Sequence, residues 1–291
     1  PLLLLLAATV GLIFLAIYLS TIRDLDAGFF KVKEGKKEIS SYVRRPFGFA
    51  VRTQVSMITF WGVTLFILGA SYGSIFGDLE SFLASNDMFQ QLLPVLPGVP
   101  VATQFMGMIM IVMGMSSAIP AVMVANKLAS EEKKKRLDVL YSHAVSRHEL
   151  LLGYTLLALI VGIVMMFLSV AGLYLASSAV MDDPIPFMTM IEAIAVYLPS
   201  MILMIGFMIL MTGFKDDLGW IGYLYLGISW FIVYIGQMVD FGDILVKLTP
   251  FSYVPTIPID DMNWLTQSII TLIGLAMFSV GYVRYGKRDL S

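Results

Sequence analysis

Cysteine is absent from the 291-residue chain, and charged residues make up only 14% of it. The lack of cysteine excludes disulfides, thiolate metal ligands and cysteine nucleophiles. The scarcity of charge accompanies a hydrophobic content of 58%, far above that of soluble globular proteins. The net charge of −2 says little, because the charges are segregated along the chain, and we expect no nucleic-acid partner. Composition therefore predicts a membrane protein.

Catalytic and nucleotide-binding motifs are missing as well. The two histidines, His143 and His148, are five residues apart, a poor spacing for one metal site on a helix. His148-Glu149 lacks the second histidine of a zinc-peptidase motif, because leucine stands four residues after His148. Gly35-Lys36 lacks the earlier glycine of a phosphate-binding Walker A loop. We expect no catalytic residue, metal or cofactor in this chain.

Long apolar runs dominate the sequence. About 20 helical residues cross a hydrocarbon core roughly 30 Å thick. The chain begins at Pro1 inside such a run, without the basic start of a signal peptide. We interpret 1–20 as the last helix of something upstream, the chain as a fragment or trimmed form, and the following six spans as one unit. The seven predicted spans lie near 1–20, 54–76, 101–125, 150–177, 188–213, 218–237 and 264–283.

Positive charge is confined to alternate connections between these spans. Of the 19 Lys and Arg residues, only Lys247 falls outside the segments that share one side with 21–53 and the C-terminal tail. Cationic segments resist translocation across a membrane. The distribution therefore predicts a multi-span protein with its C-terminus in the cytoplasm.

Two cytoplasmic segments have a structure of their own in this interpretation. In 21–53, Arg44, Arg45, Phe47 and Phe49 alternate charge with aromatic bulk before the first complete span. Such a stretch forms either an interfacial elbow helix, with its rings in the acyl boundary, or ordinary positively charged flanking sequence.

The segment 126–149 predicts a separate cytoplasmic helix near 130–144. Ser130 is its expected N-cap, and Ser146-Arg147-His148-Glu149 matches a capping box before the next span. An amphipathic helix outside the bilayer buries its apolar stripe against lipid headgroups or against a partner protein. The stripe, at positions i, i+3, i+4 and i+7, comprises Leu137, Leu140, Tyr141 and Ala144.

Small residues and prolines mark the predicted spans. Pro120 and Pro199 interrupt two of them and are expected to kink them. Four glycines of the first complete span lie within about 80° of one another on a helix, which predicts a close helix–helix contact. They are Gly62, Gly69, Gly73 and Gly77.

One charged residue, Glu192, falls inside the predicted spans, either in a substrate pathway or reaching the interface. Methionines crowd two spans, where they serve as core filler or as an adaptable surface for greasy ligands. The acidic outer segments include 238–263, whose apolar content predicts that it packs back onto the membrane part. The methionines are Met106, Met108, Met110, Met113 and Met115, and Met201, Met204, Met208 and Met211.

Three functions compete on these observations. A transporter subunit driven by a separate motor fits the cytoplasmic amphipathic helix and the missing phosphate loop. An ion channel or ion-coupled carrier usually needs several charges inside the membrane, and Glu192 alone supports it thinly. A seven-helix receptor fits an outer N-terminus and an inner C-terminus, although the count of seven includes the interrupted first run.

Three segments in the same order resemble the permeases of ABC-2-type transporters, and specifically the large permeases that export polyketide antibiotics. The similarity covers essentially 21–291. The segments are Glu131 to Arg147 with its Arg136-Leu137-Asp138-Val139-Leu140 core, Thr249-Pro250-Phe251-Ser252-Tyr253-Val254-Pro255, and Tyr285-Gly286-Lys287-Arg288-Asp289-Leu290.

The resemblance implies an all-α, type V exporter-like six-helix unit plus one preceding span, in a bacterial cell membrane. It implies an upstream permease half and a partner ATPase that binds ATP and Mg²⁺, and an outer gate at 238–263. A hydrophobic or amphipathic compound would leave between the halves, with Glu192, Met201, Met204 and Met208 as candidate pathway residues. The implied coupling residues are Glu131, Glu132, Arg136, Leu137, Asp138, Leu140, Ser146 and Arg147.

Overall fold

The computed structural model describes residues 45–79, 98–134, 146–236 and 242–288, together with positions 13, 14 and 18. The chain divides into two compact units, Pro1–Ser40 and Ser41–Ser291. In the first unit only the three isolated positions are described, and they are helical and exposed. The remainder of the predicted 1–20 span and Arg44 lie outside the described residues. The architecture below is that of the second unit.

Six apolar helical segments in the described ranges are long enough to cross a membrane, and no strand occurs there. They match the six spans predicted between 54 and 283, which confirms an all-helical multi-span protein. The segments are α2 (Pro46–Ile75) with η1 (Phe76–Asp78), α5 (Val101–Lys133), α7 (Arg147–Val180), α8 (Phe187–Ala195) with α9 (Leu198–Phe214), η2 (Asp216–Leu218) with α10 (Gly219–Ile235), and α12 (Trp264–Lys287).

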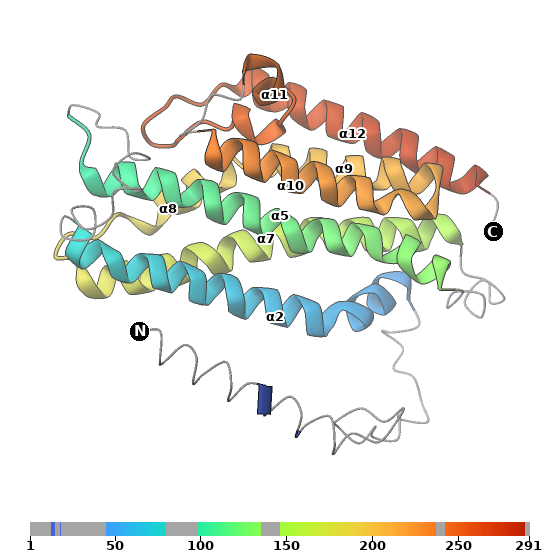
Figure 1. Cartoon of the computed structure of the whole chain (residues 1–291), viewed down its shortest axis with the longest axis horizontal. Helices are drawn as coiled ribbons and strands as arrows, with labels where there is room; N and C mark the ends of the chain where they lie inside the picture. The colour runs from blue at the N-terminus through green and yellow to red at the C-terminus, as the bar shows by residue number, and fades with distance from the viewer. Residues whose placement is uncertain are drawn as a thin grey trace. The chain divides into compact units, whose positions relative to one another are not determined.

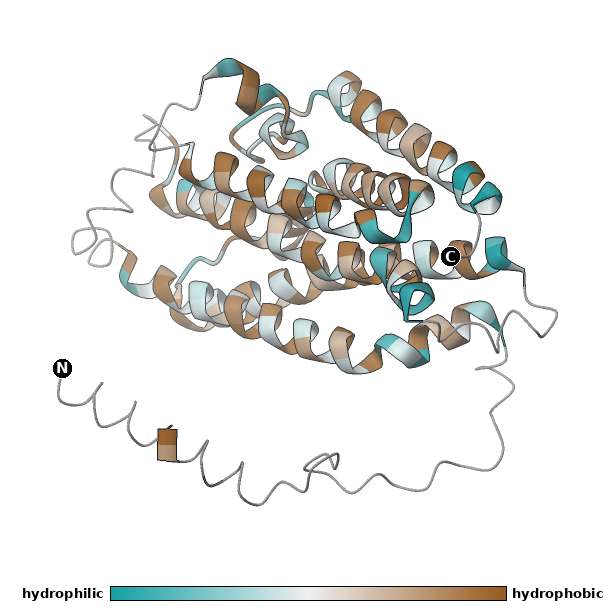
Figure 2. Ribbon diagram, turned by 45° about the vertical axis from the view of Figure 1, so that its right-hand side comes forward, coloured by the Kyte–Doolittle hydropathy of each residue, from teal (hydrophilic) through white to brown (hydrophobic). Residues whose placement is uncertain are grey.

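The long helices lie side by side along a common direction, as Figure 1 shows. Helices α5, α7 and α9 are the most buried, whereas α2, α10 and α12 are largely exposed. The exposed helices carry large apolar side chains on their surface, among them Phe60, Phe231 and Leu272. The brown ribbon along the bundle in Figure 2 marks the hydrophobic residues of these helices. Such a surface suits lipid rather than water.

All four glycines predicted to form a contact face lie against α7. A Cβ atom on Gly69 or Gly73 would collide with the backbone carbonyl oxygen of Ser169 or Leu173. In return, a Cβ on Gly172 of α7 would collide with the α2 backbone. The two backbones therefore touch, which small residues permit where no hydrophobic effect drives helices together.

A second glycine contact joins α9 to α12. Gly206 faces Gly274, and Gly213 faces Gly281, with each notional Cβ meeting the opposite backbone. On both helices the glycines are seven residues apart, about two turns, and so lie on one face. This contact was not predicted from the sequence, although the matching seven-residue spacing is visible there.

Gly69→Ala is expected to destabilise the protein, whereas Gly227→Ala is not. The first change forces α2 away from α7 and should cost about 1–3 kcal/mol. Gly227, on α10, has open space where a Cβ would lie, so alanine should be neutral or stabilise by up to about 1 kcal/mol through helix propensity. Thermal unfolding of the two variants in detergent tests the contact. Equal shifts would contradict it.

The predicted span 188–213 is two helices rather than one, with Val196 and Tyr197 between α8 and α9. Pro199, near the start of α9, has no N–H to donate to the Ala195 carbonyl, so the helix cannot continue regularly. The buried Tyr197 ring fills the space beside Gly114 of α5. At Pro120, by contrast, α5 continues unbroken.

The prediction that a separate helix begins at Ser130 is wrong. Helix α5 runs through Ser130 to Lys133, so Ser130 is an interior residue, and Glu131 and Glu132 belong to the last turn of α5. The neighbouring residues are good helix formers without Gly or Pro, and one serine does not stop such a helix. Of the remaining coupling residues, Arg136, Leu137, Asp138 and Leu140 lie outside the described residues.

The starts of α7 and α2 also differ from their predicted details. Ser146 occupies the N-cap position of α7, but its side chain makes no capping hydrogen bond, so the capping box does not form. Pro46 opens α2, where its fixed φ suits the first turn. Arg45 is exposed, whereas Phe47 and Phe49 are half-buried against the core, so these rings belong to α2 rather than to a separate elbow helix.

The described part of 238–263 packs back onto the bundle. It contains α11 (Asp243–Lys247) and η3 (Pro250–Tyr253), and Phe251 is buried. Its backbone carbonyls accept hydrogen bonds from side chains of α9, α10 and α12, which anchor the segment. The bonds run from Ser200 Oγ to Pro250 (2.9 Å), from Tyr225 Oη to Leu248 (2.7 Å) and from Gln267 Nε2 to Tyr253 (2.8 Å).

Candidate functional site

The two ends of the bundle differ in charge. We call the end where α2, α7 and α10 begin and α5, α9 and α12 end the basic end, and the opposite one the acidic end. Hydrophilic ribbon at the basic end is plain in Figure 2. Among the described residues, every Lys and Arg except Lys247 lies there. They are Arg45, Arg52, Lys127, Lys133, Lys134, Arg147, Lys215, Arg284, Lys287 and Arg288.

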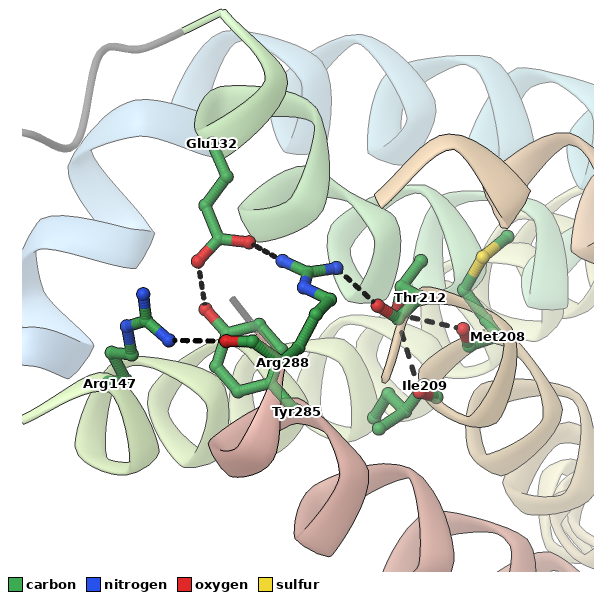
Figure 3. Close-up of polar contacts among 7 residues, drawn as sticks. All are labelled: Glu132, Arg147, Met208, Ile209, Thr212, Tyr285 and Arg288. Atoms are coloured by element: carbon green, nitrogen blue, oxygen red, sulfur yellow. Dashed lines mark hydrogen bonds and ion pairs between the residues drawn. The ribbon is translucent and has the colours of Figure 1, made fainter. Parts of the chain in front are cut away.

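A buried polar cluster at the basic end joins four helices (Figure 3). The Glu132 carboxylate accepts a hydrogen bond from the Tyr285 hydroxyl and forms an ion pair with Arg288. Arg288 also donates to the Thr212 carbonyl at 2.6 Å, and its own carbonyl accepts from Arg147 at 3.0 Å. We call these five residues the Glu132 cluster. It ties the last turn of α5 to the start of α7 and to the ends of α9 and α12.

Burial distinguishes this ion pair from its neighbour. The Glu132 and Arg288 side chains are 4% and 13% exposed, whereas those of the ion pair Lys133–Asp217 are 60% and 51% exposed. A buried pair needs its remaining polar atoms satisfied, and breaking it leaves a charge stranded away from water. An exposed pair contributes little. The Glu132 cluster is therefore the rigid connection at the point where the chain leaves α5.

Glu131 and His148 have packing environments rather than catalytic ones. Glu131 is buried and pairs with Lys127 at 2.9 Å on the same helix. The His148 ring lies 4.5 Å from the Tyr282 ring, on the side of α12 where Gly286 leaves room. Within the described ranges, no group of three or more His, Cys, Asp or Glu residues is arranged to hold a metal ion.

Near the basic end, an inner cavity of about 730 Å³ lies between α2, α5 and α10. Its lining combines aromatic side chains such as Phe60 and Trp61 with the polar Gln54 and Asn126. Asn126 donates to the hydroxyl of Tyr223, which also lines the cavity. The lining is more polar than that of the two cavities described below, since it also includes Thr53, Ser56, Lys127 and Ser130. Its volume is in the range of drug-sized ligand sites.

Two further cavities lie towards the acidic end. One, of about 420 Å³, lies beneath the anchored segment and is lined by Tyr225, Leu248 and Tyr253 among apolar residues of α9 and α12. The other, which we call the outer cavity, measures about 550 Å³ and lies beside the break between α8 and α9. Glu192 and Trp264 line it among apolar side chains, and both residues are exposed.

The four candidate pathway residues therefore fall into two groups, one that lines a cavity and three that are packed in the core. Glu192 lines a cavity, whereas Met201, Met204 and Met208 are buried and line none of the three cavities described above. Met201 fills the space beside Gly162 of α7, and Met208 fills that beside Gly222 of α10. These methionines pack as core residues. The same is true of the five methionines on α5, Met106, Met108, Met110, Met113 and Met115.

The sequence of this chain is similar to a known protein family and to a named relative. Residues 43–286 match the family model described as "Multidrug efflux system permease Rv1217c, C-terminal domain". The multidrug efflux system permease protein Rv1217c of Mycobacterium tuberculosis (strain ATCC 25618 / H37Rv) is 26% identical over 294 residues. The match covers 99% of this chain and 53% of that relative, so the chain spans about half the relative's length.

Proposed function

The chain belongs to the family of the C-terminal domain of the multidrug efflux permease Rv1217c, and from this premise we propose that it is the membrane part of an ATP-driven exporter. A separate ABC-type ATPase subunit would bind ATP and Mg²⁺ and drive the export of a hydrophobic or amphipathic compound. The observation that carries the proposal is the family match, which spans all six described membrane helices.

The charge distribution supports an orientation. Positively charged connections are retained in the cytoplasm. The basic end would then face the cytoplasm of a bacterial cell, with the C-terminus there, and the acidic end would face outwards. An ATPase that uses cytoplasmic ATP would reach only the basic end.

The proposed coupling path begins in the segment after α5. Leu137 and Leu140, with their apolar stripe, would bind in a surface groove of the ATPase. A movement of this segment would act directly on the last turn of α5, where the Glu132 cluster connects it to three other helices. Because Glu131 and Glu132 are buried, we assign them to transmission inside the bundle. The remaining proposed contacts are Arg136, Asp138, Ser146 and Arg147.

The relative's greater length supports a second half beside this one. Because the chain covers 53% of that protein, an upstream half of similar size would fit in the same native chain, or a paired subunit would replace it. The inner cavity is lined by residues of α2, α5 and α10. We propose that it is the entry site for compounds from the inner leaflet. The family match does not support the hypotheses of a channel, an ion-coupled carrier or a receptor.

An efflux measurement with controlled energy sources tests the proposal. Cells that lack their main drug pumps and express the native protein should extrude ethidium while ATP is present, even after a protonophore collapses the proton gradient. Extrusion should stop when ATP is depleted, and vector-only cells should show neither effect. Extrusion that follows the proton gradient at constant ATP would contradict the proposal and indicate an ion-coupled carrier.

A further inference from the structure

We propose that the outer cavity binds an amphipathic organic cation, with its charged nitrogen beside the Glu192 carboxylate and its apolar body between α8, α9 and α12. The inference rests on the proposed efflux function and specifies the substrate class at its outer side. The volume of about 550 Å³ suits a drug-sized ligand.

The lining of the outer cavity combines apolar walls with a single charge. Among the described residues of the lining, Glu192 is the one that is charged, and the others are apolar or aromatic, including Leu198, Ile257 and Met262. No lysine, arginine or histidine in the described part of the chain contributes to it. A ligand that is apolar with one positive charge matches this lining, whereas an anion would meet the carboxylate unfavourably.

The carboxylate is available to a ligand. Among the described residues, no hydrogen bond or ion pair involves the Glu192 side chain, in contrast to Glu132 and Glu131 at the other end. Beside it, the Ala195 carbonyl receives no hydrogen bond from Pro199, which has no N–H group, and both residues line the cavity. An organic cation that also carries N–H groups, as ethidium does in its exocyclic amines, supplies the donors that such acceptors require.

Trp264 supplies a surface for the cation itself. It is the first residue of α12, lines the outer cavity and is 73% exposed. The face of an indole attracts organic cations more strongly than any other aromatic side chain. A carboxylate and an exposed indole in one apolar cavity are a pair of groups suited to a positively charged, partly apolar molecule.

The field around the acidic end favours the same ligand class. Lys247 is its one described cation and lies 3.6 Å from Asp243. A surface of one sign raises the local concentration of ligands with the opposite charge. The described acidic residues of this end are Asp78, Asp182, Asp183, Glu192, Asp243, Asp260 and Asp261.

Binding to the purified native protein in nanodiscs of phosphatidylglycerol and phosphatidylcholine tests the site without any ATPase. Ethidium is the cationic probe and Nile red the neutral one, both measured by fluorescence anisotropy. Glu192→Gln keeps the size of the side chain and removes its charge, so ethidium affinity should fall roughly tenfold or more while Nile red affinity stays unchanged. Asp182→Asn, at an exposed acidic residue outside the cavity lining, is the matched control and should leave both unchanged.

Trp264→Leu is the second variant and should weaken ethidium binding while thermal unfolding remains as in the wild type. The proposal is overturned if Glu192→Gln and Asp182→Asn bind ethidium equally well. That result would overturn the cation site and leave the efflux proposal standing. Ethidium binding that depends on Glu192, without ATP-dependent efflux, would overturn only the efflux proposal.

Lipid amines share the chemistry of cationic drugs, so the nanodisc composition separates the two sources. Added phosphatidylethanolamine that competes with ethidium in the wild type, but not in Glu192→Gln, identifies a lipid headgroup as an occupant of the site. Absence of competition identifies a free cation as the ligand. Either result requires the same carboxylate and supports the site.

Discussion

Replacing Glu132 with alanine is expected to lower the free energy of unfolding by about 3–5 kcal/mol, because it strands the Arg288 guanidinium away from water. The Arg288 side chain is only 13% exposed, and its carboxylate partner is the one negative group of the Glu132 cluster. The Tyr285 hydroxyl loses its acceptor in the same variant. Denaturation in detergent, followed by intrinsic fluorescence, measures the change.

The neighbouring residue provides the matched control. Lys133→Ala also removes one partner of an ion pair, but that pair is more than half exposed, so the expected loss is below about 1 kcal/mol. A double variant, Glu132→Ala with Arg288→Met, should recover much of the lost stability, because neither charge of this ion pair remains buried without its partner. Similar losses in Glu132→Ala and Lys133→Ala would show that the Glu132 cluster does not hold the helix ends together.

Leu137→Asp together with Leu140→Asp is expected to abolish association with the ATPase while membrane insertion remains intact. Both leucines belong to the apolar stripe predicted after α5, and a carboxylate in a protein–protein groove would be desolvated without a partner. Pull-down of the tagged protein from mild detergent, with quantification of the ATPase subunit, measures the effect.

Ile244→Asp with Leu245→Asp is the control for this double variant. It introduces the same two charges on exposed apolar residues, which are 78% and 46% exposed, but at the acidic end. ATPase yield should stay at the wild-type level in this control. If the Leu137/Leu140 variant also retains the wild-type yield, the coupling assignment is wrong.

Apolar runs and glycine spacing were enough to predict the six membrane helices and one of their contacts. A helix in lipid needs about 20 apolar residues wherever it packs, so its existence is a local property of the sequence. The face formed by Gly69 and Gly73 is likewise local, since the residue spacing alone places both on one side of α2. Its partner, α7, could not be identified, because that depends on how all six helices pack.

The details that the sequence did not yield depend on contacts distant along the chain. Ser130 looked like a helix start because its side chain suits an N-cap, but the helix continues since its neighbours favour it. The ion pair between Glu132 and Arg288 joins positions 156 residues apart, and no periodic pattern in the sequence predicts it. Tyr285 and Arg288 do lie one turn apart at the end of the last span, which was a usable signal.

The candidate substrate residues show the same limit. Met208 and Glu192 were grouped because flexible thioethers and a membrane carboxylate both suit a pathway. Packing decides between them: Met208 is buried against α10, whereas Glu192 lines the outer cavity. Trp264 was not singled out, because its cavity forms only where the start of α12 meets the break after Glu192's helix.

Mass spectrometry of the complex formed by the tagged native protein in mild detergent is the most direct test of an ATP-driven permease. A P-loop ATPase should copurify in fixed stoichiometry with the wild type. An intact permease that purifies without any ATPase would contradict the proposed motor and make an ion-coupled carrier, with Glu192 as its first candidate residue, the hypothesis to pursue.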